Sequence, residues 1–510
     1  MFNLDGLIKV GIHQFYGIEI NDFAVTVAKT ALWIAESQMM HETEEIIEHD
    51  LDFLPLKSYA NIIEGNSLRI DWADVIPKEK LSYIMGNPPF VGYSLQNKEQ
   101  KSDILSIYVD KSGKPYKTAG KIDYVSSWYF KASEFMTGTD IKTAFVSTNS
   151  ITQGEQVASV WKPLYDRFNI HIDFAHRTFR WDSEATLKAH VHCVIVGFSV
   201  AENSANRKLY DSDKFQLVKN ISPYLLPSEN IFIESRRTPL CDVPEMVRGS
   251  QPTDNGHLIF TEDELNELLK AEPQAKKFIR PFMMGKDFIQ RKPRYCLWLV
   301  GANPSDLKKC RRVMERIEKV RAFRLASKKE ATRKKADTPT LFDEIKDSKT
   351  DYIALPVVSS ENRRYIPIEY LSYNVIAGNK LFMVENASLY HFGVLTSNVH
   401  MAWTRAVCGR LKSDYSYSNT VVYNNFPWCT PTPEQVKQIE RTAQAILDAR
   451  AKYPECSLAD LYDELTMPPE LRKAHQKNDL TVMSAYGFDK KITESECVAE
   501  LMKLYRKLTE

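Results

Sequence analysis

Long apolar runs are absent from this chain of 510 residues, and so are paired cysteines. No segment has eighteen uninterrupted apolar residues, and the N-terminal stretch MFNLDGLIKV lacks the pattern of a secretion signal. We therefore predict a cytoplasmic protein without a membrane partner. The eight cysteines are scattered, with no CxxC pair. This spacing predicts free thiols in a reducing compartment and no metal site.

Several common catalytic signatures are absent as well. The chain has no GxSxG elbow, no HExxH helix and no Cys/His cluster. Gly6 and Gly11 have the spacing of a phosphate loop, but Ile12 stands where lysine is required. Glu344 and Lys346 have the spacing of a nuclease pair, yet they lie in a charged loop away from any predicted strand. The net charge is only +1, so any nucleic-acid surface must be a local patch.

Strands and helices alternate in the first part of the chain. Hydrophobic residues at 43% and charged residues at 26% describe a globular protein, and 510 residues predict two or three domains. Short apolar segments separated by helical patterns are typical of a parallel α/β sheet. The predicted strands lie in 12–20, 60–72, 81–93 and 142–151, and a helix after Asn21-Asp22 carries Phe23, Val27, Ala31 and Ile34 on one face.

The stretch LSYIMGNPPFVGY, residues 81–93, is the most informative part of the chain. Its apolar run predicts a strand that ends in a rigid turn, Asn87-Pro88-Pro89-Phe90. Two consecutive prolines fix φ and lack N–H donors, so the carbonyls here are not drawn into a helix and can point at a ligand. The turn holds an amide, a free carbonyl and an aromatic ring together at a strand end.

Methylation of an exocyclic amine of a base suits this combination. The enzyme must accept both amine hydrogens, because the nitrogen lone pair is delocalised into the ring and has to be redirected towards the methyl donor. Asn87 Oδ1 and the Pro88 carbonyl are candidate acceptors. Phe90 is a candidate for stacking on a base that has been flipped out of the duplex. For these four residues alone, a plain turn with a Pro-Pro stop is the alternative interpretation.

Two further strand ends and an aromatic pair are candidate ligand contacts. Glu19 ends a strand, where a carboxylate can accept both hydroxyls of a ribose, although a capping role is also open. Asn66 follows the next strand and can bond a cofactor's adenine amine or simply form a turn. Phe179 and Trp181 lie near the turn between two later strands and are candidates for a second stacking wall.

The second half of the chain combines basic residues with tyrosine and asparagine in segments 359–370 and 404–428. Arg and Asn are the side chains that bind guanine and adenine edges bidentately. Segment 308–335 holds thirteen Lys or Arg against three acidic residues, which predicts either a helix along DNA phosphates or a solvated charged face. The candidate DNA-binding residues are Arg363, Arg364, Arg405, Arg410, Lys412, Tyr415, Tyr417 and Asn419.

The order of these motifs resembles the class I, S-adenosylmethionine-dependent, adenine-N6 DNA methyltransferases, and more closely the MmeI-like (type IIG/IIL) restriction-modification enzymes. The resemblance rests on GIEI (17–20), GNSL (65–68), GNPPFVG (86–92), FVSTNSI (145–151) and HRTFRW (176–181), and it continues in 403–418 and 422–428. It implies double-stranded DNA as substrate and S-adenosylmethionine as cofactor. It also implies a catalytic motif of Asn87, Pro88, Pro89 and Phe90, base stacking by Phe90 and Phe179, and cofactor contacts by Glu19 and Asn66.

One departure from the family concerns the cofactor loop. In the family a Gly-x-Gly loop precedes the strand that ends in the GIE motif, whereas none of the nineteen glycines here is separated from another by a single residue. Only sixteen residues precede Gly17, too few for that strand, loop and helix. We therefore expect the first strand to be absent from a truncated chain. A missing N-terminal segment or a second subunit would then carry the Gly-rich loop and the nuclease.

The expected fold class is α/β: a Rossmann-like class I methyltransferase sheet without its first strand, then an α+β target-recognition domain and a C-terminal helical subdomain. The predicted boundaries are 1–202 for the partial catalytic domain, 203–240 for a linker, 241–430 for target recognition and 431–510 for the helices. Within the last part, helices are predicted over 434–452, 458–465 and 494–508.

The function predicted from these residues and this resemblance is site-specific, adenine-N6 methylation of DNA in a restriction-modification system. Two alternatives stay open. The first is a catalytically inactive DNA-recognition fragment or subunit. The second is a protein-glutamine methyltransferase, because a glutamine amide nitrogen poses the same lone-pair problem and is served by a similar NPP turn.

Overall fold

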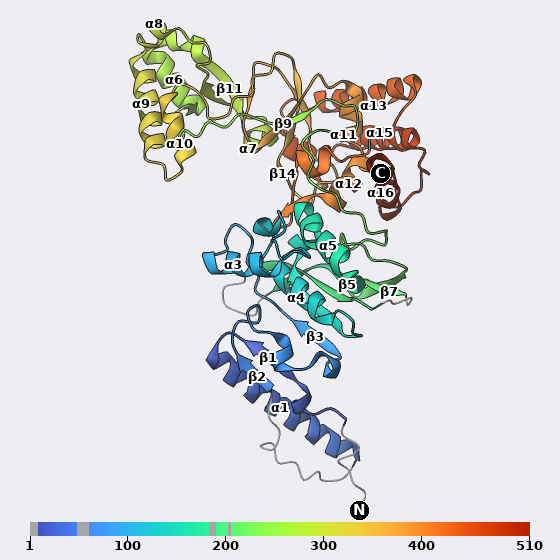
Figure 1. Cartoon of the computed structure of the whole chain (residues 1–510). Helices are drawn as coiled ribbons and strands as arrows, with labels where there is room; N and C mark the ends of the chain where they lie inside the picture. The colour runs from blue at the N-terminus through green and yellow to red at the C-terminus, as the bar shows by residue number, and fades with distance from the viewer. Residues whose placement is uncertain (1–8, 48–60, 183–189, 202–205) are drawn as a thin grey trace, which may run out of the picture. The chain divides into compact units, whose positions relative to one another are not determined.

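The structure is a computed structural model that describes residues 9–47, 61–182, 190–201 and 206–510. It divides into two compact units (Figure 1). The first unit comprises Met1–Ile151 and Ala158–Leu225, and the second comprises Thr152–Val157 and Leu226–Glu510. Among the described residues, no helix has the length and apolar character needed to cross a membrane.

A six-stranded mixed sheet forms the larger part of the first unit. Its strand order is β3-β4-β6-β5-β7-β8. β3 and β4 are parallel, and β6 runs antiparallel to both β4 and β5, so β5 points in the same direction as β3 and β4. The strands are β3 (Tyr83–Gly86), β4 (Lys142–Thr148), β5 (His171–Asp182), β6 (His190–Ser199), β7 (Arg207–Asp211) and β8 (Lys214–Val218).

Aromatic residues fill the interior between this sheet and its helices. Tyr129 of α4 stacks on Phe198 of β6 at 5.2 Å between ring centroids, and it meets Trp161 of α5 edge-on at 5.3 Å. Each of these side chains is buried to 1% exposure or less, so this aromatic face of α4 is a core face. The helices of this unit are α3 (Lys98–Ile107), α4 (Ser126–Met136) and α5 (Gly154–Phe168), besides the short α2 (Trp72–Val75).

A second, two-stranded sheet lies in the same unit. β1 (Tyr16–Glu19) pairs in parallel with β2 (Asn61–Glu64), and α1 (Asp22–Ile47) follows β1. The parallel strands at 12–20, 60–72, 81–93 and 142–151 are therefore present, but they are divided between two sheets. Among the described residues, β1 pairs only with β2 and β3 pairs only with β4. One edge of each strand is thus unpaired there.

The predicted apolar face of α1 is not buried. Val25 is the single residue of α1 in the buried class among those described, whereas Phe23, Val27 and Ile34 are 73%, 49% and 54% exposed. The residues that approach the two-stranded sheet are on the side of Val25 instead. The prediction of a helix was correct, but the prediction of which face it buries was wrong, because α1 carries apolar residues on opposite sides.

The segment predicted to be a linker, 203–240, begins with sheet structure. β7 and β8 form an antiparallel pair, and β7 adds in parallel to β5. Leu209 faces the core at 1% exposure. The strand was missed in the sequence because its apolar residues alternate with charged ones. The aromatic segment 176–181 also differs from its prediction as a loop, since it belongs to the continuous strand β5.

The second unit contains three small, mostly antiparallel sheets and a group of helices. One sheet has the order β10-β12-β11-β16, another β15-β13-β17-β9, and a third β14-β19-β18. Its strands are β9 (Met246–Arg248), β10 (Ile259–Phe260), β11 (Ile279–Met283), β12 (Arg294–Leu297), β13 (Tyr352–Pro356), β14 (Val358–Ser359), β15 (Glu369–Leu371), β16 (Ile376–Ala377), β17 (Leu381–Glu385), β18 (Gly409–Leu411) and β19 (Asp414–Ser416). The helices between them are α6 (Glu262–Ala271), α7 (Gly285–Ile289), α8 (Pro304–Leu307), α9 (Arg311–Leu325), α10 (Glu330–Lys334), α11 (Leu389–Leu395) and α12 (Asn398–Val407).

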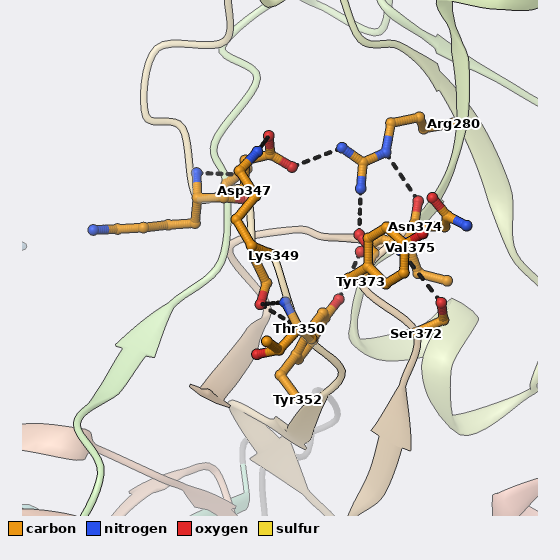
Figure 2. A network of polar contacts seen from close by, with 12 residues as sticks. Arg280, Asp347, Lys349, Thr350, Tyr352, Ser372, Tyr373, Asn374 and Val375 are labelled. Atoms are coloured by element: carbon orange, nitrogen blue, oxygen red, sulfur yellow. Dashed lines mark hydrogen bonds and ion pairs between the residues drawn. The ribbon is translucent and has the colours of Figure 1, made fainter. Parts of the chain in front are cut away.

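Arg280 of β11 joins two parts of the second unit (Figure 2). Its guanidinium forms an ion pair with Asp347 at 2.6 Å and donates to the carbonyls of Asn374, at 3.0 Å, and Tyr373. Nearby, the Tyr352 hydroxyl donates to the Val375 carbonyl at 2.7 Å. Because all three guanidinium nitrogens bond residues outside β11, Arg280 connects β11 to Asp347 and to the segment before β16.

The C-terminal region is helical, as predicted. Helix α13 (Pro433–Ala451) starts with a capping box between Thr432 and Gln435, and α16 (Glu494–Thr509) starts with one between Thr493 and Glu496. α14 (Leu458–Leu461) is shorter than expected, and α15 (Pro469–Tyr486) was not predicted. α15 buries polar residues, His475 and Asn478 among them, and this interrupts its apolar pattern. The fold class expected from the sequence is confirmed: an α/β unit, antiparallel sheets and a helical end.

Candidate functional site

Asn87 lies directly after the last residue of β3, at the carboxyl end of the strand. The side chain of Asn87 is exposed, Pro88 is buried, and Phe90 is half-buried. Residues 87 to 92 have no regular secondary structure and all peptide bonds here are trans. The predicted strand and rigid turn are both present, with the amide accessible and the first proline anchored.

Three hydrogen bonds fix the loop that follows. Tyr124 N–H donates to the Val91 carbonyl at 2.9 Å, and Tyr93 N–H donates to Asp123 Oδ1 at 3.0 Å. The other Asp123 oxygen accepts from Ser150 Oγ at 2.5 Å, and Ser150 follows β4. Asp123 thereby links the turn after β3 to the end of the neighbouring strand. The positions of Asn87 and Phe90 therefore depend on the ends of both β3 and β4.

Phe179 lies on β5, whose carboxyl end is at the same edge of the sheet as those of β3 and β4. It is half-buried, and its ring centroid is 6.3 Å from that of Trp181, which is 48% exposed. A bulge between His176 and Phe179 shifts the register of β5 against β6 just before this pair. The sheet therefore brings Asn87, Phe90 and Phe179 to one edge.

Asn66 is held in a polar network after β2. Its Nδ2 donates to Asp103 Oδ2 at 3.3 Å, and its Oδ1 accepts from Leu68 N–H at 2.9 Å. Asp103 is buried and also accepts from Arg69 Nε at 2.8 Å and the Tyr124 hydroxyl at 2.9 Å. Burial, together with Asp103, raises the pKa of Tyr124 far above its usual value, so this hydroxyl stays protonated and donates. Asn66 also donates to the Tyr124 oxygen, so its open capacity is the second lone pair of Oδ1, which can accept from an amine.

The loop after β2 accepts hydrogen bonds from Trp72 of α2 and from two residues of α4, Trp128 and Lys131. Trp72 Nε1 donates to the Ser67 carbonyl at 2.9 Å, and Trp128 Nε1 donates to Ser67 Oγ at 3.1 Å. Lys131 donates to the Leu68 carbonyl at 3.0 Å and also to that of Ile70, and burial lowers the pKa of Lys131. These bonds give Asn66 a fixed place relative to the helices that cover the six-stranded sheet.

Glu19 ends β1 and is half-buried. Its Oε1 accepts from Asn21 N–H at 3.2 Å, and in the described part of the chain its Oε2 has no hydrogen-bond donor. Asn21 Oδ1 accepts from Ala24 N–H at 3.0 Å and so caps the start of α1 as predicted. A carboxylate oxygen with a free lone pair at a strand end suits recognition of a ligand hydroxyl.

The basic candidates of the second unit divide into exposed and buried residues. Lys412 is exposed at the tip of the β18–β19 hairpin, where its φ is +59°. Arg410 lies 4.0 Å above the Tyr415 ring and donates to the Ser413 carbonyl at 3.1 Å. Tyr415 is 4% exposed, so it supports Arg410 by a cation–π contact and offers little surface to DNA.

Tyr417 and Asn419 both form hydrogen bonds within the second unit, and their role as DNA contacts stays a prediction. Tyr417 is 2% exposed and its hydroxyl is 3.0 Å from His400 Nε2, while burial lowers the pKa of His400 to about 4. Asn419 donates from Nδ2 to the Met246 carbonyl at 2.9 Å, across to β9. A tyrosine–asparagine pattern in the sequence does not separate a DNA-facing surface from a polar interior.

Arg363, Arg364 and Arg405 come together at a cavity of about 450 Å³. Arg405 forms an ion pair with Glu494 at 2.7 Å, and burial lowers the pKa of Arg363. Residues of α12, α15 and α16 complete the lining. The three arginines predicted from separate segments are therefore neighbours, and Arg405 is the one already neutralised by a carboxylate.

Sequence reasoning missed the roles of Asp103, Asp123 and Ser150. In the structure Asp123 bonds Tyr93 and Ser150, and α4 begins without a side-chain cap. No local signal marks these roles, because the partners are 21 to 37 residues apart in the chain. The described residues contain no group of three or more His, Cys, Asp or Glu able to hold a metal ion.

Three family models match consecutive parts of the chain. They are the MmeI DNA-methyltransferase domain at residues 3–211, the MmeI target recognition domain at 227–430 and the MmeI C-terminal domain at 431–510. These ranges leave only residues 212–226 between the first two domains unmatched.

Two similar proteins extend this finding. The solved structure of the type IIL restriction-modification enzyme MmeI in complex with DNA matches with a TM-score of 0.90 and 43% identity, covering 99% of this chain and 68% of that one. DNA methyltransferase A of Bacillus subtilis (strain 168) is 40% identical over 505 residues, which are 98% of this chain and 57% of that protein. The chain thus spans little more than half of this curated relative.

Proposed function

Because this chain belongs to the MmeI family, we propose that it is the methyltransferase and target-recognition part of a restriction-modification system. The proposed reaction transfers a methyl group from S-adenosylmethionine to N6 of adenine at a specific site in duplex DNA. The observation that supports it best is an exposed Asn87 at the carboxyl end of β3, in a turn that Asp123 ties to the end of β4.

The chemistry assigned to Asn87 follows from its amide. Adenine N6 is a poor nucleophile while its lone pair is conjugated with the ring. Two acceptors on its hydrogens, Asn87 Oδ1 and the Pro88 carbonyl, favour a tetrahedral nitrogen whose lone pair points away from them. Forming the N–C bond would break the S–C bond of the sulfonium and leave a thioether, and the methylated amine would release one proton to solvent. No strong base is needed, because the donor is already activated. Phe90 and Phe179 stack on the flipped adenine, at an unstacking cost of roughly a few kcal/mol.

The residues at the strand ends fit S-adenosylmethionine. Glu19 Oε2 has a free lone pair for the ribose hydroxyls, and Asn66 Oδ1 has a second lone pair for an adenine amine, in a network fixed by Asp103. When bound, the cofactor supplies a methyl group on a sulfonium. Glu19 and Asn66 orient it, and their positions after β1 and β2 belong to the two-stranded sheet.

We further propose that an additional polypeptide segment, in the same chain or a second subunit, completes the sheet. The edges of β1 and β3 are unpaired among the described residues, and the sequence has no Gly-x-Gly loop. Tyr83 and Met85, on one face of β3, are 66% and 79% exposed. A parallel strand between β1 and β3, with a Gly-rich loop after it, would satisfy both edges. The same polypeptide would carry the nuclease.

The proposed DNA contacts are the accessible cations of the second unit. Lys412 and Arg410 belong to the β18–β19 hairpin, and Arg363 and Arg364 line the cavity beside Arg405. A hairpin tip carrying a lysine, and a guanidinium supported by a tyrosine ring, suit contact with base edges and phosphates. The Tyr415 ring supports Arg410.

Methyl transfer to duplex DNA tests the proposal. The full chain is incubated with a pool of random-sequence duplexes and methyl-labelled S-adenosylmethionine, alone and with the part of the Bacillus subtilis relative that lies outside the matched region. We expect N6-methyladenine in the completed mixture. Asn87→Ala should lower the rate about 100-fold or more, since a single positioned hydrogen bond at a reacting centre has an effect of this size. Asn97→Ala, at the exposed N-cap of α3, is the matched control and should keep the rate within a few-fold.

The alternatives give different results. Methyl transfer that survives Asn87→Ala, or label on cytosine, contradicts the assigned chemistry. Label on a protein glutamine with none on DNA identifies a protein methyltransferase. DNA binding without any transfer, even in the completed mixture, identifies a recognition subunit.

A further inference from the structure

Residues 258–342, together with Ile376, form a lobe with its own hydrophobic core. The lobe contains α6, α8, α9 and α10 and the sheet β10-β12-β11-β16, and Figure 1 shows these helices gathered around β11. Except for β16, it lies between β9 and β13 in the sequence. Its core includes Leu258, Phe260, Leu265, Leu268, Phe278, Phe282, Leu297, Val313, Ile317, Val320 and Phe342.

One side of α9 is committed to this core. Val313 and Val320 are fully buried and Ile317 is 3% exposed. Arg324, one turn further, is also fully buried, and its guanidinium donates to five backbone carbonyls, those of Pro252, Thr253, Lys335, Thr338 and Leu341. Burial lowers the pKa of Arg324. All five N–H groups are used, so Arg324 fastens the segment after α10 to the lobe and is not a ligand-binding residue.

The structure sorts the thirteen cations of segment 308–335 into two groups. Arg316 lies 4.1 Å above the Phe260 ring and donates to the His257 carbonyl at 2.9 Å, and Lys335 donates to the Asp343 carbonyl at 2.8 Å. With Arg324 these are the three inward cations. The other ten cations are exposed: Lys308, Lys309, Arg311, Arg312, Lys319, Arg321, Lys328, Lys329, Arg333 and Lys334. The exposed acidic residues of the segment are Glu315, Glu318 and Glu330.

Few of the exposed cations are neutralised. Lys309 pairs with Asp306 at 3.3 Å, Arg311 with Glu315 at 3.0 Å and Lys334 with Glu330 at 2.9 Å. Arg333 donates to backbone carbonyls. Within the part of the chain that the structure describes, the remaining six have no ion pair; we call them the basic face, namely Lys308, Arg312, Lys319, Arg321, Lys328 and Lys329.

Other helices of the same unit do not share this imbalance. Residues 431–510 contain twelve Lys or Arg and fourteen Asp or Glu, so their surface charge nearly cancels. In 308–335 the chain also has no Asn, Gln, His, Tyr or Trp. The amide side chains that read adenine edges are therefore missing from the segment, its one aromatic ring is Phe323 at 38% exposure, and positive charges for phosphates are abundant.

We propose that the basic face binds the phosphate backbone of duplex DNA outside the recognised sequence, as a clamp that adds affinity without sequence preference. This inference rests on the proposed function, since it presumes a DNA substrate. Three of the six cations, Arg312, Lys319 and Arg321, are on α9, with Arg321 on the other side of the buried stripe from Lys319. α9 has 15 residues and is therefore about 22 Å long, a length over which one strand of B-DNA presents about six phosphates. The hydrophobic underside of α9 and the buried Arg324 keep the cations on a rigid support.

The salt dependence of DNA binding tests the clamp. The clamp variant carries Arg312→Gln, Lys319→Gln, Arg321→Gln and Lys328→Gln. The control carries Lys437→Gln, Lys473→Gln, Lys477→Gln and Lys490→Gln, four exposed lysines of the helical region, and so has the same net charge. Fluorescence anisotropy with a labelled random-sequence duplex of 30 base pairs is recorded for the full chain from 50 to 300 mM KCl.

We expect the slope of log K against log [salt] to become shallower by about 0.9 for each phosphate that the clamp variant no longer neutralises, and affinity at 100 mM salt to fall roughly tenfold or more. The control should keep the wild-type slope. Thermal unfolding of both variants should match wild type, because every changed side chain is exposed.

Equal slopes of log K against log [salt] for wild type and the clamp variant overturn the inference. An equal loss of DNA affinity in the control also overturns it, because the loss would then depend on net charge alone. A basic face that serves an acidic protein partner instead would leave DNA binding by the clamp variant unchanged. If the wild-type chain itself binds no duplex at any salt concentration, the proposed function fails first and the clamp fails with it. The two failures are thus distinguishable by the wild-type curve.

Discussion

Helices α1 and α13 both carry a stripe of apolar residues, but the stripe is buried in α13 and exposed in α1. In α13, Ile439, Ala443 and Ile446 are completely buried. α11 approaches so closely that a Cβ added at Gly393 would lie 2.6 Å from Ile439 Cγ2. In α1, Phe23, Val27 and Ile34 remain exposed in the described structure. An apolar stripe predicts a face that requires a partner, but not that the partner lies within the same stretch of chain.

The same contrast holds for polar groups. Asn478 is buried, donates to the Gly393 carbonyl at 2.8 Å and accepts from Thr442 Oγ1 at 2.9 Å. Asn87, an asparagine of equal chemistry, is exposed after β3. The C-terminal helices bury the amide of Asn478 in hydrogen bonds, whereas the first unit leaves the amide of Asn87 accessible. An open amide beside open strand edges is the expected state of a site that is completed by other molecules.

The largest effect that tests this comparison comes from paired truncations. Ile446→Ala should lower the free energy of unfolding by about 2–5 kcal/mol, because it leaves a cavity among α13 and its neighbours. Ile34→Ala, the same change on α1, should cost less than about 0.5 kcal/mol. Urea unfolding of the two variants at equal protein concentration measures both. Similar losses of unfolding free energy in the two variants would mean that the apolar face of α1 is buried in solution, as that of α13 is.

A buried carboxyl in α15 offers a second test, of intermediate size. Burial raises the pKa of Asp479 to about 6, although the Tyr365 hydroxyl, 2.6 Å away, and Asn398 N–H favour its ionised form. The folded state therefore holds a proton that the unfolded state releases near pH 4. The stabilising contribution of protonated Asp479 is complete below that pH and is lost as the pH rises through about 6.

Asp479→Asn removes this titration while keeping an acceptor for Tyr365. Relative to wild type, the variant should gain on the order of 2 kcal/mol in unfolding free energy between pH 4 and pH 7.5, because 2.2 pKa units separate 6 from 3.8. Denaturant unfolding at four pH values records the difference, in which the titration of nearby His475 largely cancels. A difference that does not change with pH would show that Asp479 is ionised in the folded protein.

Part of the site was predictable because its signal is local. The turn after β3 is encoded in four adjacent residues whose backbone limits are known, so its place at a strand end followed from 81–93 alone. Asn21 as the N-cap of α1 is equally local. The network around Asn66 is different, because Asp103 is 37 residues away and becomes its neighbour only when α3 packs beside the loop after β2.

Burial of charged and aromatic residues was the least predictable feature. Arg324 belongs to the same basic run as Arg321 and Lys328, and nothing in the residue type distinguishes the buried one. Only its period with Val313, Ile317 and Val320 places it on the apolar face. Tyr415 and Tyr417 were predicted as DNA contacts but are 4% and 2% exposed. Alternation in a short hairpin does not reveal which side of the hairpin is covered.

The smallest expected effect concerns the open face of β3. Met85 is 79% exposed, so Met85→Lys should change the unfolding free energy of the chain alone by less than about 0.5 kcal/mol. Phe145→Ala on neighbouring β4, at 2% exposure, should cost about 3–5 kcal/mol and is the control for sensitivity. In the completed mixture the same lysine should slow methyl transfer, because docking of a strand and its helix would bury a charge. A destabilisation of about 2 kcal/mol by Met85→Lys in the chain alone would mean that this face is already covered, and sedimentation would then show whether a second copy of the chain covers it.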